Sequence, residues 1–359
     1  MGVSYRLIEP NELDASLIST WRAIQSKSKA FSSPYFCPEF TQLVGVVRDN
    51  VRVIVIENDG RIAGFFPHQR SFLGMGKPVG GPLSDYHGVI TEPDAEWDIG
   101  PLMRAAKLSV WSFNHLVDDT GKFGSHVEAR TSSPQIDLIY GYEHYAKGRR
   151  DAGSDYIKNT EGLARKLGRE VGDLRFTLHE PGSEAIGQLI RWKSAQYRDS
   201  HLPDAFAVQW TSDLLHRIAE MQTEGFAGVC SVLRAGDRIV AIHFGMRSAR
   251  VLHYWFPAYD PEFAKFSPGI ILLLRMAEAL ASVGVRIIDL GAGMSQYKQR
   301  LMNSEVALLK GAVELPSLLA TARQIQRSIE VRAARIGVPK ICLLPLRAIR
   351  RIERSLIYR

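Results

Sequence analysis

The run from His253 to Asn303 constrains the fold of this chain more than any other stretch. It holds a strand, a tight turn, a helix, a second strand and a glycine-rich loop in close succession. Ser267 suits the N-cap of the helix and Pro268 its first position, and the apolar residues that follow predict that the helix is buried. The run therefore predicts an α/β fold with a mixed central sheet.

The start of this helix has the features of an anion site. Unpaired backbone N–H groups and the positive end of the helix dipole attract anions, and a glycine lets a phosphate approach closely. We therefore expect Ser267, Gly269 and Ile270 to bind a phosphate-bearing cofactor. An ordinary capped helix is the alternative. The strand over 285–290 strengthens the functional interpretation, because ligands tend to bind where strand ends open into loops.

Length and composition are typical of a folded protein with more than one domain. The chain has 359 residues, of which 45% are hydrophobic and 23% charged. Its three cysteines, Cys37, Cys230 and Cys342, are too widely spaced to indicate a disulfide framework or a metal site. The N-terminus lacks the pattern of a signal peptide, and no apolar run is long enough to span a membrane. We expect a cytoplasmic protein without a metal cofactor.

The basic excess lies in the C-terminal tail. Residues 321–359 hold ten Lys or Arg and two Glu, a balance of 10 − 2 = +8, within a chain of net charge +7. The remainder carries 35 basic and 36 acidic residues, or −1. The main body therefore has no charge pattern that indicates DNA binding.

The tail itself has helical periodicity, with arginines around two apolar faces. Such helices are typical of peripheral anchors at anionic membranes, although they also pack on a protein body and leave a charged rim. Arginine pairs four residues apart form a third possibility, since they fork onto phosphates and stack on guanine, as in cyclic di-GMP sites. The predicted regulatory arginines are Arg323, Arg327, Arg347 and Arg351.

The body divides into two similar halves. Two predicted helices followed by a strand hairpin occur near residues 12–67 and again near 184–246. A basic stretch over 145–171 connects them, either as a solvated connector or as part of a groove for an anionic substrate. We expect domains at 1–150 and 151–315, followed by a helical tail at 316–359.

Four stretches carry a resemblance to one family. They are YDPEFAKFSPGIILLL from Tyr259, SPYFCPEF from Ser33, GGPLSDYHGVI from Gly80 and GDRIVAIHFGMR from Gly236, which together span about residues 30 to 310. They resemble the CelD-type acetyltransferases of cellulose biosynthesis. These are similar to the Fem peptidyltransferases, whose fold is two GNAT-like domains in tandem. The resemblance implies that fold and the transfer of an acyl group, usually acetyl from coenzyme A, to an amine.

Acyl transfer needs a neutral amine, a polarised thioester and a proton for the leaving thiolate. Asp85 and His87 are candidates for proton handling because residues two apart in an extended chain share one face. His243 points from its strand beside the small Ala241 and Gly245. The alternatives are turn, surface and structural roles. The predicted catalytic residues are Asp289, Tyr297, His243, Asp85 and His87.

Substrate contacts are predicted around the last glycine-rich loop. Lys298 has family-like spacing and is expected to grip a phosphate of a nucleotide-linked or lipid-linked sugar. The predicted substrate-binding residues are Lys298, Tyr86, Trp255, Gly291 and Gly293. The turn before Gly269 departs from the usual coenzyme A loop, which has two small residues where this chain has one glycine. Contact of a pyrophosphate with several backbone amides is therefore in doubt.

Together these features predict an N-acyltransferase that uses acetyl-coenzyme A and acts on an amino sugar in exopolysaccharide, cellulose or holdfast-like adhesin synthesis. The acceptor rests on the resemblance alone. One alternative is Fem-like aminoacyl transfer to a cell-wall precursor. Another is a degenerate scaffold whose tail binds a membrane or cyclic di-GMP.

Overall fold

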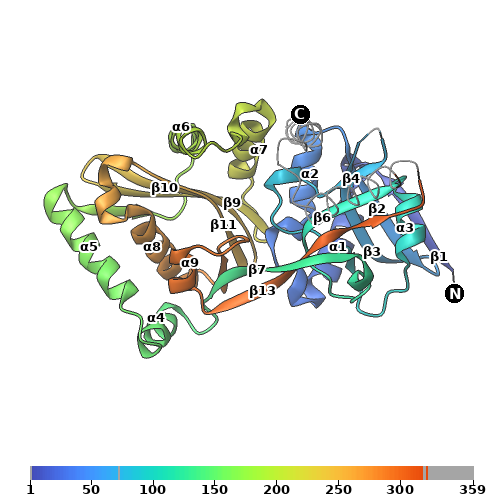
Figure 1. The fold of residues 1–359 in the computed structure, drawn as a ribbon, viewed down its shortest axis with the longest axis horizontal. Helices are drawn as coiled ribbons and strands as arrows, with labels where there is room; N and C mark the ends of the chain where they lie inside the picture. Colours follow the sequence, from blue (N-terminus) through green and yellow to red (C-terminus); the bar gives the residue numbers. More distant parts are fainter. Residues whose placement is uncertain (1, 72, 318–320, 322–359) are drawn as a thin grey trace, which may run out of the picture. The chain divides into compact units, whose positions relative to one another are not determined.

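The computed structural model describes residues 2–71, 73–317 and 321, and its contacts divide the chain into two compact units. Unit 1 comprises Met1–Lys27, Val44–Arg130 and the chain from Leu309 (Figure 1). Unit 2 comprises Ser28–Leu43 and Thr131–Leu308. Residues 131–150, which the sequence assigns to the first domain, lie in unit 2. The predicted tail helices and their arginines lie outside the described residues.

The sheet of unit 1 is mixed, with one parallel pair. Its order is β1-β2-β3-β4-β6-β13, with the short β5 paired to β3. Only β4 and β6 run parallel, at Met75↔Val110 and Gly76↔Trp111. The bounds are β1 Val3–Ile8, β2 Val51–Asn58, β3 Arg61–Arg70, β4 Met75–Lys77, β5 Ile90–Thr91, β6 Val110–Leu116 and β13 Ser304–Glu314, of which the residues from Leu309 belong to this unit.

Helices cover both faces of this sheet. Alternate residues of β3 point to opposite faces, which explains why two successive phenylalanines have different neighbours. Phe65 stacks on Trp21 of α1 (Ala15–Lys27) at 4.6 Å between ring centroids. Phe66 contacts Trp111 at 4.7 Å, in the core that also holds Leu102 of α3 (Ile99–Ala105). The remaining turns are 3-10 helices at Pro10–Glu12, Gly81–Leu83 and Gly124–His126.

Unit 2 also has a mixed sheet with one parallel pair. Its order is β7-β12-β11-β10-β9-β8, and only β11 and β12 run parallel. The bounds are β7 Val127–Asp137, of which the residues from Thr131 belong to this unit, β8 Leu174–Thr177, β9 Phe226–Ala235, β10 Arg238–Ser248, β11 Val251–Tyr259 and β12 Ile287–Asp289.

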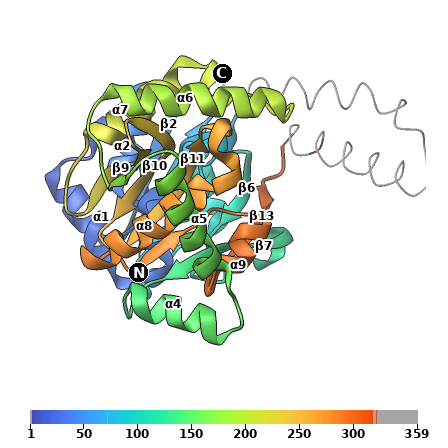
Figure 2. The same ribbon diagram turned by 90° about the vertical axis from the view of Figure 1, so that its left-hand side faces the viewer.

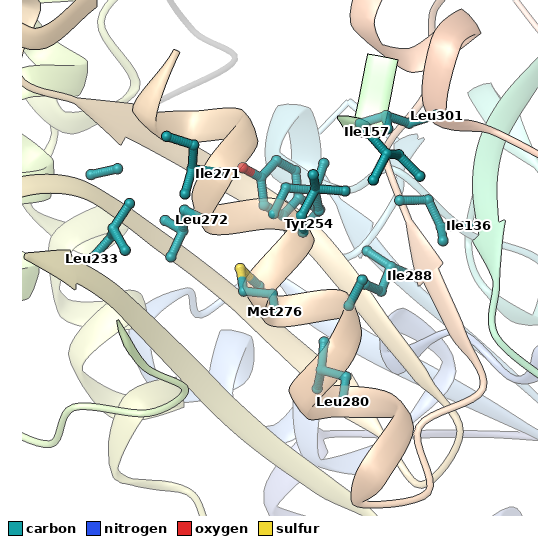
Figure 3. Close-up of a cluster of buried hydrophobic side chains, with 14 of the residues drawn as sticks. Ile136, Ile157, Leu233, Tyr254, Ile271, Leu272, Met276, Leu280, Ile288 and Leu301 are labelled. Carbon is teal, nitrogen blue, oxygen red and sulfur yellow. The ribbon is translucent and has the colours of Figure 1, made fainter. Parts of the chain in front are cut away.

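Helices α6 and α7 lie together on one face of this sheet, and α5 and α8 lie on the other (Figures 1 and 2). Ile271, Leu272 and Met276 of α8 pack with Tyr254 and Ile288 in the core of the second face (Figure 3). The helices are α4 Tyr142–Asp151, α5 Tyr156–Glu170, α6 Ser183–Asp199, α7 Gln209–Glu220, α8 Pro268–Ser282 and α9 Gln296–Leu301, with 3-10 turns at Lys29–Phe31, Pro34–Phe36, Ala205–Ala207 and Pro261–Phe266. Helix α2, Pro38–Val47, passes from unit 2 into unit 1.

The predicted repetition of architecture is confirmed. In unit 1 the hairpin β2–β3 follows α1 and α2, and in unit 2 the hairpin β9–β10 follows α6 and α7. Both hairpins carry one bulged residue shortly after the turn, Ala63 in β3 and Val240 in β10. The α/β class with a mixed sheet is also confirmed. Within the described residues, no helix has the length and apolar character needed to cross a membrane.

Candidate functional site

The two parallel strands of unit 2, β11 and β12, are paired over a short length and then separate. Their pairing ends at His253↔Asp289, but β11 continues to Tyr259. β12 ends because the chain turns away at Gly291, whose φ of 79° lies in the left-handed region that favours glycine. Within the described chain, the later part of β11 therefore has no strand partner on the side of β12. This is the open edge of unit 2.

A β-bulge lies at the beginning of the open edge. Phe244 pairs with Phe256 and Met246 with His253, so two residues of β11, Tyr254 and Trp255, oppose Gly245 alone. A Cβ atom at Gly245 would lie 2.2 Å from the His253 carbonyl oxygen. Glycine is therefore required there, and the bulge turns the later part of β11 away from a regular ladder.

The pairing of β11 with β10 determines which backbone N–H and carbonyl groups of the open edge remain unpaired. The Asp260 N–H donates to the Val240 carbonyl at 3.1 Å. Because bonded and non-bonded pairs alternate in an antiparallel ladder, Pro257 and Tyr259 direct their backbone groups away from β10. Proline has no N–H, so the edge offers the Pro257 carbonyl and both polar groups of Tyr259. An extended chain that carries amides has the right groups to pair with it.

Asp289 lies where β11 and β12 part, and its buried carboxylate is well bonded. It accepts hydrogen bonds from Ser133 Oγ at 2.7 Å, Gln135 Nε2 at 2.8 Å and the Gly291 N–H at 2.9 Å. His253 Nδ1 lies 3.4 Å from Asp289 Oδ1, and both side chains are buried. Asp289 thus fixes the end of β12, the following loop and the His253 ring together. Sequence reasoning missed Ser133 and Gln135, which come from distant β7.

His243 lies in the core of unit 2 and is stacked on Tyr254, at 4.4 Å between ring centroids with the rings 4° from parallel. Neither ring nitrogen has a hydrogen-bond partner among the described residues. Burial, with a smaller contribution from His253, holds the pKa of His243 well below its ordinary value. The ring is therefore neutral, and it fills the space beside Gly245 that the sequence predicts to be open.

The start of α8 differs from the predicted anion site. Ser267 occupies the N-cap position, but its φ is 53° and its side chain makes no capping bond. Its carbonyl accepts from the N–H groups of Ile270 and Ile271, at 3.0 and 3.2 Å. Pro268 has no N–H, so among the described residues only Gly269 retains an unpaired N–H there. The amides of Ile270 and Ile271 are therefore bonded within the helix, and the binding of a cofactor by Ser267, Gly269 and Ile270 stays a prediction.

Lys298 holds the glycine-rich loop after β12. Its Nζ donates to the carbonyls of Gly291, Ala292 and Gly293 at 2.8, 3.3 and 3.2 Å. Neighbouring Tyr297 is largely buried, and this burial, reinforced by Tyr156, raises its pKa to about 12. Tyr297 is therefore protonated at neutral pH. The predicted phosphate contact of Lys298 stays a prediction.

The remaining predicted residues lie in unit 1. Asp85 Oδ1 is 3.7 Å from Nδ1 of His115, and neither ring nitrogen of the buried His87 has a hydrogen-bond partner among the described residues. Burial, with a contribution from His115, keeps the pKa of His87 well below its usual range. The Asp85 carboxylate therefore lies near His115, and its role with His87 in proton handling stays a prediction. Tyr86 is buried in the core.

The predicted catalytic residues are thus divided. Asp289, Tyr297 and His243 lie in unit 2 with the predicted cofactor residues, and Asp85 and His87 lie in unit 1. Their catalytic roles stay predictions. The described part of the chain contains no group of three or more His, Cys, Asp or Glu side chains placed to hold a metal ion.

Comparison with known proteins places the open edge within a recognised domain. Residues 154–299 match the family model "Acetyltransferase (GNAT) domain". No match was found among curated protein sequences. The fold is similar to the C-terminal DUF2156 domain of a protein named as a lysylphosphatidylglycerol synthetase from Agrobacterium fabrum, with TM-score 0.51 and 10% identity over 87% of this chain and 96% of that one.

It is also similar to FemX, with TM-score 0.51 and 8% identity over 77% of this chain and 90% of that one. The tandem fold expected from the resemblance is confirmed, since both units share one element order and residues 154–299 match a GNAT domain. The region that matches an acetyltransferase domain of the GNAT type contains the strands from β8 to β12 and the open edge. The narrower CelD-type resemblance stays a prediction.

Proposed function

We propose that this protein is an N-acyltransferase that moves an acyl group from an acyl-coenzyme A to the amine of an amino sugar, during synthesis of an extracellular polysaccharide. The match of residues 154–299 to a GNAT acetyltransferase domain supports the reaction class. The amino-sugar acceptor, nucleotide-linked or lipid-linked, rests on the resemblance to CelD-type proteins. Acetyl is the proposed acyl group.

The open edge of β11 is the observation that carries the proposal. The arm of coenzyme A that bears the thiol contains two amide groups, so it can pair with an unpartnered strand edge as an extended peptide does. The Pro257 carbonyl and the Tyr259 backbone groups would bind these amides. The thioester would then lie beside the bulge at Tyr254 and Trp255, whose backbone N–H groups are candidates for stabilising the oxyanion.

The chemistry requires one proton to leave the amine and one to reach the thiolate. The neutral amine attacks the thioester carbonyl, a C–N bond forms, and the C–S bond breaks when the tetrahedral intermediate collapses. Tyr297 is the proposed proton donor to the thiolate, because its phenol carries a proton at neutral pH, and the proton that the amine loses passes to water. Asp289 and His253 are buried, and they would position the end of β12 and the bulge.

Calorimetric titration with acetyl-coenzyme A tests the donor site. A Cβ at Gly269 would contact only the Tyr259 ring, at 3.6 Å, so both Gly269→Ala and Gly269→Phe are expected to fold. We expect one acetyl-coenzyme A bound per chain, at least tenfold weaker binding by Gly269→Phe, and little change for the Gly269→Ala control. Equal binding by wild type and Gly269→Phe would move the donor away from α8, and failure of wild type to bind would exclude acetyl-coenzyme A.

An aminoacyl donor is the second candidate, and the start of α8 favours it. Only the Gly269 N–H is available there among the described residues. Asp260 and Glu262 of the preceding turn lie 3.5 and 2.7 Å from the Arg238 guanidinium, so this cation is already paired with carboxylates. Transfer of an amino acid from aminoacyl-tRNA by a protein that does not bind acetyl-coenzyme A would establish this alternative.

A further inference from the structure

The bulge in β11 brings a row of aromatic rings to the α6 face of unit 2. Regular alternation would place Tyr254 and Phe256 on one face. Tyr254 instead lies in the core beside α8, whereas Phe256 contacts Phe206 at 5.2 Å between ring centroids. Trp255 joins the same face at 4.7 Å from Phe256, and Tyr197 of α6 lies 6.4 Å from Phe206. The row therefore runs from α6 to the beginning of the open edge.

Three members of this row are only partly buried. Tyr197, Phe206 and Trp255 have intermediate exposure, whereas Phe256 is buried beneath them. On the other side Trp255 contacts the buried Tyr35 at 5.9 Å, which fixes the indole from behind. Aromatic rings that are held rigidly and remain partly exposed offer a flat apolar surface at low entropic cost. The C–H face of a pyranose ring is a ligand for such a surface.

Lys193 adds a positive charge at the end of the row. Its Nζ lies 5.2 Å from the centre of the Tyr197 ring and donates to Gln196 Oε1 at 2.8 Å. The Lys193 side chain is only partly buried, this burial lowers its pKa to about 8, and it has no carboxylate partner among the described residues. A lysine that is desolvated without a counterion is unfavourable, so an anionic ligand would relieve that cost.

We propose that Lys193, Tyr197, Phe206 and Trp255 bind the acceptor: an amino-sugar ring stacks on the aromatic side chains, and a phosphate attached to that sugar pairs with the Lys193 ammonium. This inference rests on the proposed function, since it names where the acceptor binds. It favours a phosphorylated or nucleotide-linked amino sugar over a neutral one. The Trp255 backbone belongs to the bulge beside the donor edge, so an acceptor there lies next to the proposed thioester.

Direct binding tests the acceptor site without the reaction. Glucosamine, glucosamine 1-phosphate and uridine diphosphate glucosamine are titrated separately into the full chain by calorimetry. We expect the two phosphorylated sugars to bind at least tenfold tighter than glucosamine, and Lys193→Met to remove most of that difference. Phe206→Leu is expected to weaken the binding of all three sugars. Tighter binding of the uridine compound than of the 1-phosphate would support a nucleotide-linked amino sugar as the acceptor.

The control is Lys122→Met, because Lys122 of unit 1 also lies over an aromatic ring, at 5.3 Å from Trp97. It is expected to bind every sugar as wild type does. Lys193→Met removes a desolvated charge and is expected to fold. Unchanged binding by Lys193→Met and Phe206→Leu, or binding of acetyl-coenzyme A without any of the sugars, would overturn the acceptor site. Failure to bind acetyl-coenzyme A would count against the proposed donor instead.

Discussion

The two parallel strand pairs of this protein begin alike and end differently. In unit 2, β11 and β12 separate after His253 and leave an open edge. In unit 1, β4 and β6 separate after Gly76, but the chain returns and lays His87 beside β6. The His87 N–H donates to the His115 carbonyl at 3.3 Å, and the Val117 N–H donates to the His87 carbonyl at 2.9 Å.

This difference leads us to expect a donor site in one unit only. An open strand edge binds an extended ligand only while the chain itself does not use the same backbone groups. In unit 1 the strand that continues beyond the pair is β6 and not β4, and the segment around His87 pairs with it, so we expect only unit 2 to bind a donor. The single acetyl-coenzyme A expected per chain is a direct consequence of this comparison.

The largest expected effect contrasts one carboxylate from each unit. Asp289→Ala leaves three buried donors without their acceptor, so we expect the free energy of unfolding to fall by about 3 kcal/mol. Asp85→Ala removes a partly exposed carboxylate 3.7 Å from His115 and is expected to cost less than about 1 kcal/mol. Urea denaturation of both variants measures the difference. Equal losses would show that Asp289 does not stabilise the site as described.

Acidification is expected to destabilise unit 1 more than unit 2. The folded-state pKa values of His68, His87 and His243 lie below their ordinary value because the rings are buried, with His68 at about 4. Below pH 6.5 the unfolded chain therefore binds protons that the folded chain does not, and stability falls by about 1.4 kcal/mol per pH unit for each such histidine.

Two of these histidines lie in unit 1 and one lies in unit 2. Burial also lowers the pKa of His179 in unit 2, but this ring is only partly buried and its pKa falls less than that of His243. Hydrogen exchange of β3 and β10 amides, compared at pH 7 and pH 5 after correction for intrinsic rates, would measure the loss in each unit. Equal losses in the two strands would contradict the expected difference.

The smallest expected effect concerns the loop that ends β12. Lys298→Met removes an ammonium bonded to three carbonyls, so we expect a loss of about 1 kcal/mol and faster hydrogen exchange near Gly293. The control is Lys147→Met, because Lys147 forms only an exposed pair with Asp151 and is expected to contribute less than about 0.5 kcal/mol. Unchanged exchange in Lys298→Met would show that other contacts hold the loop.

Elements with strong local signals could be predicted from the sequence. Helices α1 and α2 lie in the stretch near residues 12–67 where two helices are predicted, and β12 lies inside the strand predicted over 285–290. Both hairpins could be predicted because turns that contain glycine separate their apolar strands. Strand β4 could not be predicted, because three residues are too few to show an alternation of apolar and polar side chains.

The details of the site depend on partners far away in sequence. The bulge at Tyr254 and Trp255 is a property of register between two strands, and no local pattern at those residues indicates it. Asp289 was predictable as a polar residue at a strand end, but its partners Ser133 and Gln135 come from more than 150 positions earlier. The left-handed conformation of Ser267, which leaves its side chain without a capping bond, could not be predicted either.

The way the two units share the chain has a consequence for biosynthesis. Unit 2 includes Ser28–Leu43, which a ribosome makes early, whereas the sheet of unit 1 is completed by the end of β13, made after all of unit 2. Unit 1 therefore emerges with an unfilled strand position that stays open until translation passes Glu314. Because each unit comprises more than one segment of the chain, dividing the coding sequence at one position cannot produce either unit complete. A stop codon anywhere before β13 is expected to yield a chain that chaperones retain or proteases remove.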